Sequence, residues 1–314
     1  MATRHLQLPA WKALEAAHAT RVDEATAGHR ARLREHRAHP VEDFLFTYYP
    51  FKPAQLRRWH PGPGVRLEGA TTGDRAGWRF YREVGSDIEL DVAAYRETRG
   101  GTADFVRRLV SATRARPAQL GCFGLHEWAM VYRQGRDEVR HAGWPLRLGG
   151  HGTDEVVESL QIRCTHFDAF RFYTPPARPL NLLQPTRESQ VAMEQPGCLH
   201  AGMDLYKWCM KLAPGVPSEL TMDCFDLARE IRELDMRASP YDLAALGYAP
   251  VAIETAAGRA EYAAAQRGFA THGQALRERL LQALDAIDRG HPDPGGSAER
   301  EKVGSSTTLR WGGD

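Results

Sequence analysis

The sequence predicts a single, mostly helical α+β domain over residues 1–289, followed by a tail at 290–314. The 314 residues are 42% hydrophobic, so the chain can bury a sizeable core and needs no disulfides or other cross-links to be stable. Apolar residues recur at helical spacing from Gly197 to Arg289, which predicts a helical C-terminal half. Strand-like alternation is limited to short segments earlier in the chain, so the β element is small. If the domain divides, the division falls near residues 115–120.

The first elements are a long helix and an aromatic segment. Residues 9–37 predict the helix, with Pro9 near its start. The segment from Phe44 to Trp59 is dense in aromatic residues and ends with Arg57 and Arg58. Such a segment either faces the core or stacks on bases and holds phosphates.

The middle of the chain predicts short strands and further helices. Residues 65–68 and 78–84 alternate on either side of a turn-rich stretch, which indicates a hairpin. Helices are expected at 88–98 and 102–114. Residues 162–173 alternate well enough to predict a strand.

Composition limits the class of partner. Lys and Arg number 41 against 40 Asp and Glu, so DNA binding would need a local basic patch. The sequence has no signal-like N-terminus and no apolar run long enough to span a membrane, and its five cysteines form no CxxC pair. We expect a cytoplasmic protein with no membrane association and no obligate protein partner. The tail has too few apolar residues to repay ordering and predicts disorder.

A helix over residues 197–212 would carry one narrow polar stripe. His200, Asp204, Lys207 and Lys211 share this stripe, and apolar residues cover the rest. The stripe is either the solvated edge of a nearly buried helix or the lining of a cleft. In a cleft, His200 and Asp204 could act as an acid/base pair, with Lys207 attracting an anion.

The next helix, over residues 218–236, carries carboxylates in two environments. One flank stacks like charges in a line: Glu219, Asp223, Asp226, Glu230 and Glu233. This line requires cations, either arginines or a metal. Asp235 instead falls within the apolar face, where a carboxylate is paired with arginine or kept for chemistry. We therefore rank Asp235 first among the catalytic candidates.

Histidines in apolar surroundings provide candidate metal ligands. His126 and Glu127 are adjacent in one apolar run, and alternation would place His166 and Asp168 on one strand face. Together with His200 they could form a zinc or iron site. The spacings match no compact motif such as HExxH, so satisfied core histidines are the other interpretation. The sequence favours no cofactor and leaves a divalent metal as an option.

Several motif classes are missing from the sequence. It contains no GxxxxGK[ST] loop, no GxGxxG after a strand and no GxSxG elbow. Nucleotide-dependent transfer and serine hydrolysis therefore lose support.

Several stretches carry a family resemblance. They are 47–49, 55–62, 124–128, 178–181, 194–208 and 234–243, which include Glu-Gln-Pro-Gly-Cys-Leu-His-Ala at 194–201 and Leu-Asp-Met-Arg-Ala-Ser-Pro-Tyr-Asp-Leu at 234–243. Over most of residues 40–285 the chain resembles an actinobacterial family catalogued as 3-methyladenine DNA glycosylases.

The resemblance implies a hydrolase of base-excision DNA repair that cleaves an N-glycosidic bond and releases an alkylated purine. Asp235 would stabilise the sugar cation or activate water, with His200 and Asp204 in support. The expected base-stacking residues are Trp128, Tyr206, Trp208 and Tyr241. The expected polar contacts to the substrate and its phosphates come from Arg57, Arg58, Lys207 and Arg232.

A helix-hairpin-helix glycosylase would also need a hairpin whose amides hold a DNA phosphate. Ala213–Pro217 is close to such a hairpin, and Asp235 follows at about the expected distance, but Pro217 replaces a glycine and removes one amide.

Two other classes of function stay open. A helical metal-dependent enzyme acting on a small molecule would use His126, Glu127, His166, His200 and the acidic line from Glu219 to Glu233. A non-catalytic ligand-binding protein would use the same pocket without turnover. Asp235 locked by two arginines would favour the second class.

Overall fold

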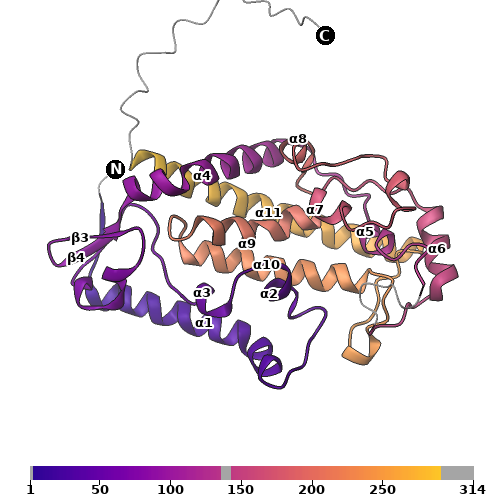
Figure 1. Ribbon diagram of the computed structural model, residues 1–314, viewed down its shortest axis with the longest axis horizontal. Helices are drawn as coiled ribbons and strands as arrows, with labels where there is room; N and C mark the ends of the chain where they lie inside the picture. Colours follow the sequence, from indigo (N-terminus) through magenta and orange to yellow (C-terminus); the bar gives the residue numbers. More distant parts are fainter. Residues whose placement is uncertain (1–2, 136–142, 291–314) are drawn as a thin grey trace, which may run out of the picture.

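A computed structural model describes residues 3–135 and 143–290 of the chain. The predicted class is confirmed, because the fold is predominantly helical with one small sheet. Its centre is a bundle of four helices that pack on one another (Figure 1). They are α4 (Val92–Ala115), α9 (Leu199–Leu212), α10 (Ser218–Arg237) and α11 (Ala256–Arg289).

Residues before the bundle wrap one of its sides. Helix α1 (Leu8–Arg34) confirms the predicted N-terminal helix and packs against α10 (Figure 1). The aromatic segment forms α2 (Phe44–Tyr48), which contacts α10, and α3 (Pro53–Leu56), which contacts α1. Most of its aromatic rings join the apolar core, as one of the two interpretations of this segment predicted.

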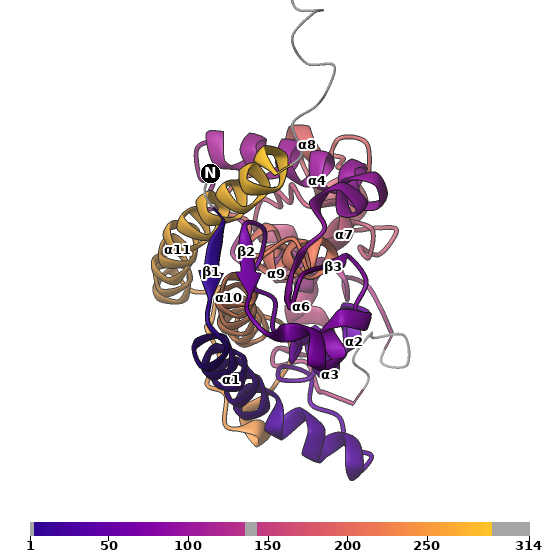
Figure 2. The same ribbon diagram turned by 90° about the vertical axis from the view of Figure 1, so that its left-hand side faces the viewer.

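The sheet lies at the end of the molecule where α1 and α4 begin (Figure 1, Figure 2). Its strand order is β1 (Arg4–Leu6), β2 (Val65–Leu67), β4 (Asp87–Leu90) and β3 (Tyr81–Val84). β1 and β2 are parallel, and the other pairs are antiparallel.

The predicted hairpin between residues 65–68 and 78–84 is wrong. The hairpin joins β3 to β4, and β4 pairs with β2 on its other edge. The turn-rich stretch forms two short 3-10 helices, η1 (Ala70–Thr72) and η2 (Asp74–Gly77). The tight turn at Gly85, where φ is 64°, brings β3 and β4 together instead.

Two further element predictions need correction. The two helices expected at 88–98 and 102–114 are one helix, α4, whose N-terminus is capped by the Asp91 carboxylate. Packing of α4 on α9 and α11 outweighs the helix-breaking tendency of Gly100 and Gly101. The strand expected at 162–173 does not form.

Residues 162–173 are irregular apart from one short helix. Ile162 makes an isolated bridge to Asn181, and α7 (Phe167–Phe170) follows. The Asn181 side chain accepts from the amide of Cys164 and donates to its carbonyl, and these two bonds hold the segment in place of a strand ladder. His166 and Asp168 therefore do not share a strand face.

The remaining elements are short, and most gather at the end of the bundle opposite the sheet (Figure 1). They are α5 (Leu125–Ala129), α6 (Gly149–Ser159), η3 (Arg178–Leu180), α8 (Gln190–Met193) and η4 (Ala244–Leu246).

One main apolar cluster contains residues from both sides of positions 115–120, such as Val106 before them and Leu280 after them. In the part of the chain that the structure describes, no helix has the length and apolar character needed to cross a bilayer. Apart from Gly290, the predicted disordered tail lies outside the described residues.

Candidate metal centre

The hairpin of α9 and α10 brings two candidate residues to one end of the bundle. His200 lies in the first turn of α9, and Asp235 lies in the last turn of α10. Because the two helices run antiparallel, these positions meet at the end opposite the sheet (Figure 1). Helix α5 adds His126, and Gly124 supplies the left-handed φ of 69° that starts this helix.

His126, His200 and Asp235 form a buried group that we call the two-histidine triad. One possible ligand atom from each residue lies within 4.8 Å of the others. His126 Nε2 is 3.0 Å from Asp235 Oδ1, and the His126 and His200 rings meet edge-on with centroids 4.4 Å apart. Asp235 is 0% exposed, which confirms that it lies within the apolar face of its helix.

The two closest atoms of the triad have no hydrogen-bond partner. His126 Nε2 and Asp235 Oδ1 are both buried, and their 3.0 Å contact lacks the alignment of a hydrogen bond. An orphaned buried polar atom is costly, so two of them side by side require an explanation. Ligands about 2.1 Å from one metal ion lie about 3 Å apart when they subtend a right angle. The spacing therefore fits two ligands of one cation.

Arg232 balances the charge of Asp235 from the other side. Its Nη1 donates to Glu127 Oε1 over 3.0 Å and to Asp235 Oδ2 over 3.4 Å. The guanidinium lies over the Phe44 ring, 3.7 Å from the ring centroid. Among the described residues, one arginine rather than two pairs with Asp235, and it leaves the Oδ1 atom facing His126.

Electrostatics shift the pKa values of the two histidines in opposite directions. Burial alone would lower the pKa of His126, but the Asp235 carboxylate outweighs burial and raises that pKa. Burial, with His126 adding to it, holds the pKa of His200 well below its usual range. His200 is therefore a neutral imidazole at neutral pH, the form that binds metals.

A second buried group, which we call the lysine cluster, contains His166, Glu194, Asp204 and Lys207. His166 Nε2 lies 3.2 Å from Asp204 Oδ2 and 3.5 Å from Glu194 Oε1. The Lys207 ammonium bonds to Asp204 Oδ2. The His166 ring stacks on His200 with centroids 5.2 Å apart, so the cluster borders the triad.

The carboxylates of the lysine cluster are held by several donors. Tyr49 donates its hydroxyl to Asp204 Oδ1 over 2.7 Å, and the Gln190 amide donates to Glu194 Oε1 over 2.6 Å. Burial would raise the pKa of Asp204, but Lys207 and His166 outweigh burial and lower it strongly. Burial raises the pKa of Glu194.

The polar stripe predicted on the 197–212 helix lies mainly inside the molecule. His200, Asp204 and Lys207 are buried, and Lys211 alone of the four is exposed. The solvated-edge interpretation therefore holds for Lys211 alone, and the fold encloses the other three residues. Asp204 hydrogen-bonds Tyr49, His166 and Lys207 instead of forming the expected pair with His200.

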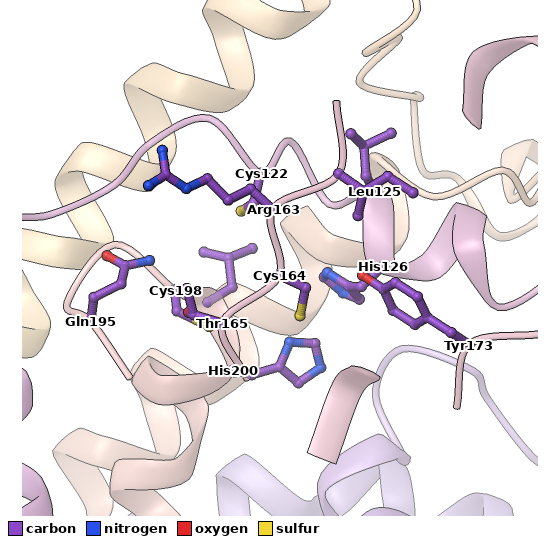
Figure 3. Close-up of a pocket in the computed structure, with 12 residues that line it drawn as sticks. Cys122, Leu125, His126, Arg163, Cys164, Thr165, Tyr173, Gln195, Cys198 and His200 are labelled. Atoms are coloured by element: carbon purple, nitrogen blue, oxygen red, sulfur yellow. The ribbon is translucent and has the colours of Figure 1, made fainter. Parts of the chain in front are cut away.

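Two hollows meet at His200. The thiol cavity, of about 20 Å³, has room for about one water molecule. Its lining includes His126, His200, Tyr173 and the cysteines Cys122, Cys164 and Cys198 (Figure 3). Burial raises the pKa of all three thiols, to about 11 for Cys164, which keeps them protonated and unreactive.

The aromatic cavity, of about 260 Å³, is large enough for a small organic molecule. Phe44, Tyr48 and Phe172 contribute rings to its wall, and His200, Arg232 and Asp168 contribute polar groups. The sequence did not single out these three aromatic residues as a binding site, although two of them belong to the aromatic segment. The sequence also did not predict that Tyr49 and Glu194 belong to this site. Tyr49 lies in an apolar segment and Glu194 in a loop, and only their tertiary contacts identify them.

The four aromatic residues expected to stack on a base lie in the core instead. Trp128, Tyr206, Trp208 and Tyr241 are all buried, and none lines the aromatic cavity. Trp128, for example, donates its indole N–H to the carbonyl of Ala238. Large rings on a nearly all-apolar helix pack inward, so their ring type alone does not identify a binding surface.

The residues expected to contact phosphates are dispersed. Arg57 and Arg58 are exposed beside α3, and Arg57 pairs with Asp23 of α1. Lys207 is buried in the lysine cluster, and Arg232 lies in the wall of the aromatic cavity.

The candidate DNA-gripping hairpin at Ala213–Pro217 is covered by the fold. Pro214, Gly215 and Val216 are buried, and a Cβ on Gly215 would meet the Tyr95 side chain at 2.6 Å. The amide of Gly215 already donates to the carbonyl of Leu212. In this arrangement the hairpin presents no row of free amides to a phosphate.

Arginines of other helices pair with two carboxylates of the acidic line on α10. Arg21 of α1 pairs with Asp223 and Asp226, and Arg279 of α11 also pairs with Asp223. These ion pairs tie α1 and α11 to α10.

No family model, curated protein or solved structure matches this chain. Function is therefore inferred from the chemistry of the site.

Proposed function

We propose that this chain is a metal-dependent enzyme in which His126, His200 and Asp235 hold one divalent cation beside a small-molecule pocket. The observation that carries this proposal is the pair of buried ligand atoms, His126 Nε2 and Asp235 Oδ1, that lie 3.0 Å apart without a hydrogen bond. A shared cation would satisfy both atoms at once.

Two histidines and one carboxylate are a ligand set for zinc or iron(II) that leaves coordination positions open for water and substrate. A cation so held polarises a carbonyl or phosphoryl group and makes bound water a nucleophile at neutral pH. Metal-assisted hydrolysis is accordingly the reaction class that we favour.

The surrounding residues have supporting roles in this scheme. Arg232 holds Asp235 by the oxygen that faces away from His126, which orients the carboxylate toward the cation. Glu127 balances the charge of Arg232. His200 borders both cavities, so a cation bound to it is reached by a substrate in the aromatic cavity and by water in the thiol cavity.

Hydrolysis of the N-glycosidic bond of an alkylated purine in DNA is the second candidate. One observation favours it: Asp235 lies beside His200, and His200 lines a cavity walled by Phe44, Tyr48 and Phe172. Such rings can stack on a flipped, cationic base, and Asp235 would stabilise the sugar cation.

Metal content tests the first proposal. We expect purified wild type to bind about one equivalent of zinc or iron(II) by equilibrium dialysis, and His126→Gln to bind at least about tenfold more weakly. His18→Gln is the matched control, because His18 is equally buried and bonds only to the carbonyl of Leu56. Equal affinity in wild type and His126→Gln would rule out the triad as the site.

Turnover separates the candidate reactions. Wild type and Asp235→Asn, each with and without a chelator, are incubated with duplex DNA carrying alkylated purines and with a panel of small esters, amides and phosphate esters. Metal-dependent turnover in the panel supports the first proposal. Chelator-resistant base release that Asp235→Asn abolishes supports the second, and metal binding without turnover indicates a binding protein.

A further inference from the structure

We infer that the Lys207 ammonium occupies the place of a second metal ion, so that the chain holds one cation at the two-histidine triad and none at the lysine cluster. This inference rests on the proposed function for the first ion and adds the stoichiometry of the centre. It also assigns a latent metal site to His166, Glu194 and Asp204.

The latent site has the geometry of a ligand set. One atom each from His166, Glu194 and Asp204 lies within 4.8 Å of the others, and all three residues are buried. His166 Nε2 is 3.2 Å from Asp204 Oδ2 and 3.5 Å from Glu194 Oε1. Ligands about 2 Å from a tetrahedral ion lie about 3.3 Å apart, so these distances would suit zinc.

The difference between the two sites lies in what already satisfies them. In the triad, His126 Nε2 and Asp235 Oδ1 have no donor or acceptor. In the lysine cluster the ammonium of Lys207 binds Asp204 Oδ2, the same oxygen that faces His166 Nε2. The protein therefore supplies a lysine ammonium at one site and none at the other.

The fold fixes Lys207 at this place. It follows Asp204 by three residues on α9, one helical turn away, and its ammonium lies 4.4 Å from the centroid of the Trp208 ring. A second carboxylate, Asp168, lies 3.6 Å from the same ammonium. A divalent ion among the three ligands would adjoin this fixed positive charge and be repelled by it.

The arrangement also has a consequence for the substrate. Asp168 lines the aromatic cavity, so the Lys207 ammonium stands one carboxylate away from any bound molecule. Unlike a metal ion, this group cannot leave the site, because it is covalently part of α9.

Counting bound zinc tests the inference. Wild type, Lys207→Met and Lys207→Arg are dialysed to equilibrium against zinc alone, and bound metal is measured against protein. We expect one ion in wild type, two in Lys207→Met and one in Lys207→Arg, which keeps the charge. Two ions in wild type, or the same number of ions in a folded Lys207→Met as in wild type, would overturn the inference.

The outcomes keep this inference apart from the proposed function. If wild type bound no ion and Lys207→Met bound one, the proposed metal site at the two-histidine triad would be wrong. The same result would support the inference that Lys207 excludes a metal ion from the lysine cluster. Asp204→Asn combined with Lys207→Met should remove the second ion again. Circular dichroism and thermal melting verify folding, and Lys207→Gln replaces Lys207→Met if the latter does not fold.

A zinc-soaked crystal of wild type gives a result that needs no variant. We expect an anomalous peak at the two-histidine triad and none among His166, Glu194 and Asp204. A peak beside Lys207 would overturn the inference.

Discussion

Asp235 shows how one buried carboxylate can be tolerated and still remain available for chemistry. It is fully buried on α10, where Arg232 binds one of its oxygens and His126 approaches the other. Removing one partner from such a buried group costs about 3–5 kcal/mol, whereas apolar replacements of the whole group are often neutral. Packing alone therefore does not require these residues.

At the same scale, Tyr49 and Tyr206 are neighbours that allow the contribution of a hydrogen bond to stability to be separated from that of burial. Tyr49 donates to Asp204, whereas the hydroxyl of the adjoining Tyr206 is buried without a partner. Tyr49→Phe should lower the free energy of unfolding by about 2 kcal/mol, because it strips a donor from a buried carboxylate. Tyr206→Phe should change it by less than about 0.5 kcal/mol or increase it.

Urea unfolding of the two variants, followed by circular dichroism, measures this difference. Equal losses in both would mean that the Tyr49 hydroxyl contributes nothing specific to Asp204.

At the scale of elements, α11 is the backing against which the site-bearing hairpin packs. It runs from Ala256 to Arg289 and contacts α4, α9 and α10. Its Gln266 reaches the loop before α9 by donating to the carbonyl of Gly197 over 2.6 Å. The position of His200, in the first turn of α9, therefore depends on how α11 packs against α9.

Two glycines of α11 allow the packing at the start of this helix to be tested. A Cβ on Gly258 would lie 2.0 Å from the carbonyl oxygen of Ala252, whereas a Cβ on Gly268 meets nothing within 4 Å. Gly258→Ala should destabilise the protein by about 2–3 kcal/mol through backbone displacement. Gly268→Ala, on an exposed helical position, should stabilise it by about 0.5–1 kcal/mol.

Chemical denaturation midpoints of wild type and the two variants test this pair. A Gly258→Ala protein as stable as wild type would show that the start of α11 can shift freely.

At the scale of the whole molecule, His60 joins the sheet to the bundle. Its carbonyl accepts from the amide of Ser218 at the start of α10, and its ring bonds to the Tyr81 hydroxyl of β3 over 2.9 Å. Burial, with Arg75 adding to it, lowers the pKa of His60 to about 3. The folded protein therefore keeps this imidazole neutral at pH values where the unfolded chain is protonated.

This shift predicts a loss of stability as the pH falls. The contribution of His60 is complete above the unfolded pKa of about 6.5 and declines as the pH drops toward 3. Between pH 7.5 and 5.5 we expect His60 to account for about 1 kcal/mol of the wild-type loss, so that His60→Gln loses about 1 kcal/mol less than wild type. His272→Gln, at an exposed site on α11, should keep the wild-type slope.

Free energies of unfolding of wild type, His60→Gln and His272→Gln, measured across this pH range, test this prediction. If His60→Gln lost stability as steeply as wild type, the acid sensitivity would belong to other groups.

The sequence by itself determined most of the helical framework and one property of the site. Apolar residues at helical spacing predicted α1, α9 and α10, because that periodicity reflects a local burial requirement along each helix. The same periodicity placed Asp235 on the buried face of α10 before any neighbour was known. Local patterns carry this information because the position of a residue along a helix fixes the side of the helix on which its side chain lies.

Tertiary structure alone decided which polar groups meet. The ligand atoms of His126, His200 and Asp235 converge although the residues come from three separate helices, and Tyr49 holds Asp204 across 155 positions of sequence. It also placed Lys207 among carboxylates and replaced the expected strand at 162–173 with a turn and a short helix. Such contacts depend on how distant segments pack, and the spacing of residues along one segment holds no record of that packing.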